Sequence, residues 1–109
     1  MERIYNKLVR DKIPVIIKNN GETPVIKILN TEEYKKELEK KLYEEYLEVV
    51  NASEEDRLEE LADMLEVMRA LATIDGYSLE DIINSAKEKV YKRGAFNEKI
   101  FLEKVIVNE

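Results

Sequence analysis

The stretch from residue 38 to residue 74 constrains the fold most, because it reads as two acidic helices separated by a short break. In its first half, Leu38, Leu42 and Val49 follow the three-and-four spacing of a buried helix face. Glu45 occupies the position that should complete this apolar stripe. A carboxylate on such a face is costly unless a positive partner or a bound cation neutralises it. The first helix is therefore expected to bind a positive group through Glu45 as well as to pack against the core.

The second half of this stretch also places acids on an otherwise apolar helix. A continuous helical row is formed by Glu60, Met64, Val67, Leu71 and Ile74. Asp63 lies one turn from Glu60 on the same side. From residue 61 to residue 74 the helix is apolar on nearly every side, which predicts that it is mostly buried. Few lysines or arginines lie on these faces, so a bound cation is the natural way to neutralise the acids.

Two missing residue types narrow the chemistry that the chain can perform. The 109 residues include no cysteine and no histidine, which excludes disulfides, thiolate catalysis and imidazole ligands. A metal site must therefore use oxygen ligands, which favour Mg²⁺, Mn²⁺ or Ca²⁺. The net charge of −6 gives no basic footprint for a nucleic-acid polymer. We expect a soluble, cytoplasmic protein without membrane contact, because no signal peptide or long apolar run is present.

The remaining segments predict one all-α domain covering residues 1–109, a bundle of three main helices and a short N-terminal helix. Capping residues and glycines predict helices at about residues 11–18, 31–51, 54–75 and 79–93. Residues 23–29 are rich in β-branched side chains and predict a short strand, or alternatively an extended loop packed on the bundle. Residues 96–107 are expected to be partly extended, with alternate side chains pointing inward.

Burial predicts that the chain self-associates. Three helices and a short fourth cannot cover a helix that is apolar on nearly every side. Part of that surface should therefore meet another subunit, giving at least a dimer.

The acids form two spaced motifs whose geometry favours a shared site. Glu44, Glu45 and Glu48 make EExxE, and Glu60 and Asp63 make ExxD. Side chains three residues apart project to the same side of a helix, and two antiparallel helices would bring the motifs face to face. Carboxylates gathered in this way form a hard-cation site of the kind that holds a triphosphate. The alternative is a set of structural or surface carboxylates, because acidic faces are usually solvated.

These motifs resemble the all-α nucleoside triphosphate pyrophosphohydrolases of the MazG superfamily, which also contains phosphoribosyl-ATP pyrophosphohydrolase and the dimeric dUTPases. Four segments agree in order along the chain: YNKLVRDKIP, KLYEEYLEV, EELADMLEVMRAL and KRGAF. Carried over by position, the resemblance implies that Mg²⁺, or Mn²⁺ in its place, is held by Glu45, Glu48, Glu60 and Asp63. It also implies a homodimer or homotetramer whose helices combine into a four-helix core.

The resemblance implies hydrolysis of a nucleoside triphosphate between its α- and β-phosphates, with nucleotide-pool housecleaning as a biological role. A carboxylate beside the metal, Glu44 or Glu48, is the candidate proton acceptor. Among the candidate cations for the phosphate oxygens, the pair before Gly94 is favoured because glycine lets the chain approach closely. These phosphate-binding candidates are Lys92, Arg93, Lys7, Arg10 and Lys12. For each of them, ordinary surface or helix-terminal charge is the alternative.

Two other functions remain open. One is phosphoribosyl-ATP hydrolysis, which the absence of a histidine from EELADMLEVMRAL disfavours. The other is a non-catalytic, metal-binding helical interaction protein. The sequence does not fix the base or sugar of a nucleotide substrate, the number of metal ions, or which carboxylate is the general base.

Overall fold

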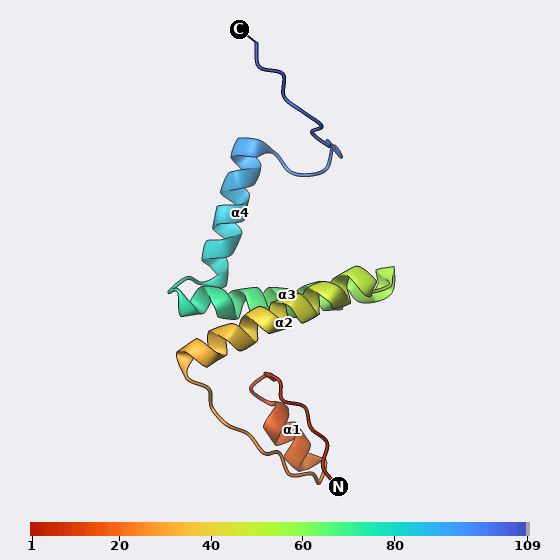
Figure 1. Cartoon of the computed structure of the whole chain (residues 1–109), viewed down its shortest axis with the longest axis vertical. Coiled ribbons are helices and arrows are strands. Elements are labelled where there is room, and N and C mark those ends of the chain that lie inside the picture. The colour runs from red at the N-terminus through yellow and green to blue at the C-terminus, as the bar shows by residue number, and fades with distance from the viewer. Residues whose placement is uncertain (109) are drawn as a thin grey trace.

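In a computed structural model, which describes residues 1–108, the chain forms four helices and no strand within that range. They are α1 (Ile13–Asn19), α2 (Thr31–Asn51), α3 (Glu54–Ile74) and α4 (Leu79–Arg93). The long helices α2 and α3 lie side by side as an antiparallel pair, α4 rises from the end of α3, and α1 lies beyond α2 (Figure 1). The predicted all-α class is confirmed.

Local capping explains where the helices begin and end. The Asn30 side chain accepts a hydrogen bond from the Glu33 backbone N–H at 2.8 Å, and together they form a capping box at the start of α2. Ser78 and Asp81 form the same arrangement at the start of α4. After α3 the chain turns at Gly76, whose φ of 83° is costly for residues with a side chain. The long helices therefore have the predicted bounds, whereas α1 begins two residues later than expected.

The hydrophobic core lies between α2 and α3. Leu38, Val67 and Ala70 are its buried residues. Partly buried side chains pack against them, namely Leu8, Tyr34, Leu42, Leu71 and Ile74. Through the contact of Leu8, the N-terminal segment is fixed against the helical pair.

A single chain leaves much apolar surface uncovered. On α3, Leu58, Leu61 and Leu65 are 76%, 46% and 41% exposed. The radius of gyration is 19.2 Å, against about 13 Å for a compact domain of this length. The prediction that residues 61–74 are mostly buried is therefore met on only part of the helix surface within one chain. Within residues 1–108, no helix has both the length and the apolar character that crossing a membrane requires.

The short strand predicted at residues 23–29 is not formed, and the segment has no regular structure. Val25 and Ile28 are 96% and 90% exposed, so these side chains do not pack on the bundle either. β-branched residues favour strands because they pack on a pleated surface, and the described chain supplies no neighbouring strand. Residues 96–107 are likewise non-helical, but their inward positions, such as Val107 at 84% exposure, face solvent.

Candidate metal centre

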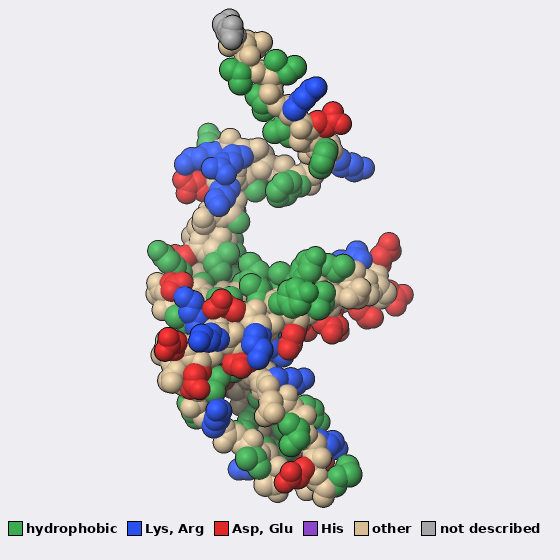
Figure 2. Space-filling model, in the orientation of Figure 1, with side chains coloured by type: hydrophobic (Ala, Val, Ile, Leu, Met, Phe, Trp, Pro, Cys, Tyr) green, Lys and Arg blue, Asp and Glu red, His purple; other side chains and the backbone are tan. Residues whose placement is uncertain are grey.

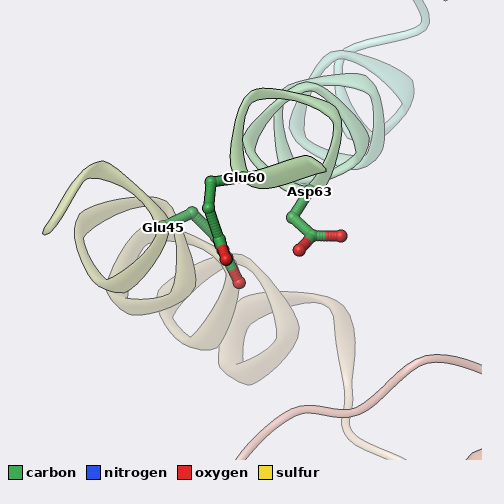
Figure 3. A group of neighbouring side chains, drawn as sticks. All are labelled: Glu45, Glu60 and Asp63. Carbon is green, nitrogen blue, oxygen red and sulfur yellow. The ribbon is translucent and has the colours of Figure 1, made fainter. Parts of the chain in front are cut away.

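Three of the predicted acids meet between α2 and α3. Glu45 from α2, and Glu60 and Asp63 from α3, each offer one carboxylate oxygen, and these oxygens lie within 4.8 Å of one another. Figure 3 shows the Glu45 and Glu60 side chains extending toward each other from facing helices, with Asp63 beside them on α3. All three residues are partly buried. We call these three residues the acidic triad.

The helical hairpin itself explains why the triad forms. Glu45 lies on the stripe of α2 that packs against α3, in line with the partly buried Leu42 and Val49. Glu60 and Asp63 project to one side of α3 because they are three residues apart. The break between the helices is so short that the end of α2 must face the beginning of α3. The predicted face-to-face arrangement of the two motifs is therefore observed for these acids.

Burial and mutual repulsion make the triad unfavourable as three bare carboxylates. Burial is the largest cause of the raised pKa of Glu45, the charge of Asp63 is the second, and Lys41 opposes both. Burial is also the largest cause of the raised pKa of Glu60, followed by the charges of Glu48 and Asp63. A cation placed among these groups would favour their ionised forms.

Two cations act on the triad in the part of the chain that the structure describes. The Arg10 Nη2 donates a hydrogen bond to Asp63 Oδ1 at 2.7 Å. Lys41 lies one turn before Glu45 and lowers its pKa, while its Nζ lies 3.5 Å from a Glu44 carboxylate oxygen. The effect of Lys41 on Glu45 could have been predicted from the sequence, because residues four apart on a helix are neighbours.

Glu44 and Glu48 lie outside the triad. Both are exposed on α2, on either side of Glu45 along the helix. Glu48 nevertheless provides the largest electrostatic contribution to the raised pKa of Glu60. The predicted roles of Glu48 as a metal ligand and of both residues as proton acceptors therefore stay predictions.

Of the five predicted phosphate-binding cations, which all lie in the described range, Arg10 alone bonds to the triad. Lys92 pairs with Glu88 at 2.9 Å near the far end of α4. That helix meets α3 around Ala72, about 13 Å along the α3 axis from Asp63 at 1.5 Å per residue. Within one chain, Lys92 and its neighbour Arg93 therefore lie away from the triad, and the preference for them as phosphate-binding residues stays a prediction.

The other two candidates lie on the N-terminal segment without a triad contact. The Lys7 ammonium lies 5.7 Å from the centre of the Tyr5 ring, and Lys12 is the N-cap residue of α1. Arg10 is therefore the residue of this segment that the structure connects to the acids. Sequence reasoning named Arg10 but had no local signal to place it above Lys7 or Lys12, because its contact depends on how Leu8 packs against the core.

The raised pKa of Glu45 predicts that Glu45→Gln stabilises the metal-free protein at pH 7. The folded state binds this proton more tightly than the unfolded state, so ionisation as the pH rises above the usual glutamate range costs stability. We expect a gain of up to about 1 kcal/mol at pH 7, given the partial exposure, and a smaller one at pH 4, where most of the carboxyl groups are protonated in both states. Thermal unfolding with a chelator at both pH values measures this difference.

The matched control for this experiment is Glu39→Gln, because Glu39 is exposed on the same helix outside the triad. It should change stability little at either pH. If Glu45→Gln melts below the wild type at pH 7 in chelator, the claim that its surroundings destabilise the ionised Glu45 carboxylate is wrong.

Comparison with known proteins identifies one relative but no family. An uncharacterized protein of Mycolicibacterium smegmatis (strain ATCC 700084 / mc(2)155) is 46% identical over 50 residues, which is 46% of this chain. The chain spans about half the length of that curated relative, with 51% of it matched. No protein-family profile matches the chain. No solved structure matches it either.

Proposed function

We propose that the chain is a divalent-metal-dependent nucleoside triphosphate pyrophosphohydrolase, which releases a nucleoside monophosphate and pyrophosphate. The observation that carries this proposal is the acidic triad, in which Glu45, Glu60 and Asp63 converge from two helices. Arg10 is bonded to Asp63 alone among them, so the three carboxylates are not fully neutralised. The resemblance of the four sequence segments to the MazG superfamily supplies the reaction.

The donor set of the triad suits a hard divalent cation. Its ligand atoms are carboxylate oxygens, which Mg²⁺ and Mn²⁺ prefer. Ligands of one octahedral ion at about 2.1 Å lie roughly 3–4 Å apart, so oxygens within 4.8 Å need only small side-chain adjustments. The raised pKa values of Glu45 and Glu60 mean that a bound cation would relieve a penalty that the chain now bears.

The surrounding side chains support phosphoanhydride hydrolysis. A divalent ion at the triad would neutralise phosphate oxygens and lower the pKa of a water molecule. Glu44 and Glu48 are exposed next to Glu45, so either can accept the proton of an attacking water. Arg10 provides a guanidinium beside the triad, with the planar geometry that pairs with phosphate. No histidine or cysteine is needed for this chemistry.

We also propose that the functional unit is at least a homodimer with a core of four helices. The accessible surface is 10400 Å², about 4000 Å² above the value expected for a compact monomer of 12.8 kDa. Obligate homodimers bury about 2000–5000 Å² in total, which this excess can supply. Figure 2 shows hydrophobic side chains gathered over the pair formed by α2 and α3.

Sedimentation equilibrium should therefore give at least twice the chain mass of 12.8 kDa at micromolar concentration. The double variant Leu61→Glu with Leu65→Glu places two charges on the exposed apolar side of α3 and should shift the population toward monomer. Glu59→Gln, at an exposed acidic position of the same helix, is the control and should leave the mass unchanged. A wild-type chain that is monomeric throughout this range would refute the dimer.

The catalytic proposal is tested by product analysis with the wild-type protein. A panel of standard and modified nucleoside triphosphates is incubated with Mg²⁺, with Mn²⁺ or with chelator, and monophosphate and pyrophosphate are measured. Metal-dependent release of both products in equal amounts is the expected result. Folded protein that releases neither product and gains no stability from metal would refute the proposal. Stabilisation by metal without turnover of the panel would direct the assay to phosphoribosyl-ATP.

A further inference from the structure

The guanidinium of Arg10 occupies part of the site that the proposed function assigns to a metal ion. It bonds to Asp63 Oδ1 at 2.7 Å, and the two side chains are 60% and 43% exposed. A divalent cation that uses Asp63 as a ligand would meet this guanidinium on the same carboxylate. The two cations are therefore competitors, or must share Asp63.

The backbone around Arg10 is held in place while its side chain is free to move. Leu8, two residues earlier, packs against the buried core between α2 and α3. The Arg10 carbonyl accepts a hydrogen bond from the Ile13 N–H at 3.0 Å, which ties it to the first residue of α1. The exposed Arg10 side chain can consequently leave Asp63 without displacing the segment that carries it.

Neighbouring charges explain why Arg10 bonds to Asp63. Glu66 lies one turn further along α3, and its carboxylate oxygens accept two hydrogen bonds from Arg69, at 2.8 and 2.7 Å. Hydrogen bonding by Arg69 is the largest cause of the lowered pKa of Glu66, and Arg10 contributes only its charge. Asp63 has no such partner on its own helix, so it accepts the bond from Arg10.

Building on the proposed metal site, we propose that Arg10 is a switch that couples metal binding to phosphate binding. In the metal-free chain its guanidinium neutralises Asp63. When a divalent ion binds Asp63, the guanidinium is released and turns to an oxygen of a pyrophosphate or triphosphate group held at the metal. Arginine suits both positions, because its planar fork pairs with carboxylates and with phosphates.

The switch predicts opposite effects of Arg10→Gln on two ligands. Without the competing guanidinium, Mn²⁺ alone should bind up to about fivefold more tightly, as expected for loss of an exposed ion pair. The Mn²⁺-loaded variant should bind pyrophosphate about tenfold more weakly or worse, because a charge-assisted hydrogen bond is lost. Arg10→Lys keeps the positive charge but lacks the planar guanidinium. Its affinity for pyrophosphate should lie between those of the wild type and Arg10→Gln.

Isothermal titration calorimetry measures both effects, first with Mn²⁺ alone and then with pyrophosphate added to the Mn²⁺-loaded protein. Arg3→Gln is the matched control, because it removes the same charge from the exposed Arg3–Glu22 pair, which lies outside the triad. The control should retain the wild-type affinities for both ligands within about twofold. If the loss of one positive charge were the whole cause, Arg10→Gln and the control variant would show the same affinities for Mn²⁺ and for pyrophosphate.

Each contrary result is distinct. If the wild type binds Mn²⁺ but Arg10→Gln binds it no more tightly, or binds pyrophosphate as the wild type does, the switch is wrong and the metal site stands. If neither protein binds Mn²⁺, the proposed function fails and the switch fails with it.

Discussion

Leu38→Ala is expected to lower the free energy of unfolding by about 2–4 kcal/mol. Leu38 is the most buried residue of the core, with 3% of its surface exposed. Its side chain fills the contact between α2 and α3 together with Val67 and Ala70. Truncating this buried side chain removes apolar contacts and leaves a cavity between the helices, so the cost should lie well above that of a surface substitution.

Urea unfolding followed by circular dichroism at 222 nm gives this difference directly. Glu39→Ala is the control, because Glu39 is the next residue on α2 and is exposed. Its substitution should change the free energy of unfolding by less than about 0.5 kcal/mol. A loss below about 1 kcal/mol for Leu38→Ala would show that the contact between the long helices does not hold the fold together.

Most of the fold was predictable because the signals that define it are local. The capping box at Asn30 and the one at Ser78 each involve residues three positions apart. The glycine after α3 stops that helix through its own backbone conformation. Such signals fix where a helix begins and ends without any knowledge of its neighbours, which explains the agreement for α2, α3 and α4.

The strand that the sequence wrongly predicted depends on contacts between distant segments, and so do the surroundings of Lys92. A strand at residues 23–29 needs a partner strand, and residues 1–108 contain none. The position of Lys92 depends on the direction in which α4 leaves α3, which no pattern within α4 encodes. The sequence therefore gives the type of these residues, whereas the side chains around them depend on the three-dimensional arrangement of the helices.

The residues of the candidate site also differ in whether local spacing or a contact between distant segments brings them there. Glu60 and Asp63 share a helix side through their spacing alone, and Glu45 follows from its place on an apolar stripe. Their meeting requires only that α2 and α3 form an antiparallel hairpin. The selection of Arg10 over other cations, in contrast, depends on the contact of Leu8 with the core.

The largest functional effect is expected from neutralising the triad. Glu45→Gln and Glu60→Gln should each lower metal-dependent turnover by about a hundredfold or more, because each removes a charged ligand worth several kcal/mol of stabilisation. Glutamine keeps the size of the side chain, so the fold should persist. Glu59→Gln neutralises the exposed neighbour of Glu60 and should retain near wild-type turnover.

Thermal unfolding distinguishes loss of the metal from loss of the fold. At a metal concentration about a hundred times the dissociation constant, binding should stabilise the wild type by about 2.7 kcal/mol, or roughly 10 °C in melting temperature. Glu45→Gln should lose most of this increase and yet melt above the wild type in chelator, because burial and repulsion raise the pKa of the Glu45 carboxyl. The order of the two proteins should therefore reverse when metal is added. Parallel melting of the wild type and the variant in both conditions would mean that the triad carboxylates are structural and that the metal, if it binds, binds elsewhere.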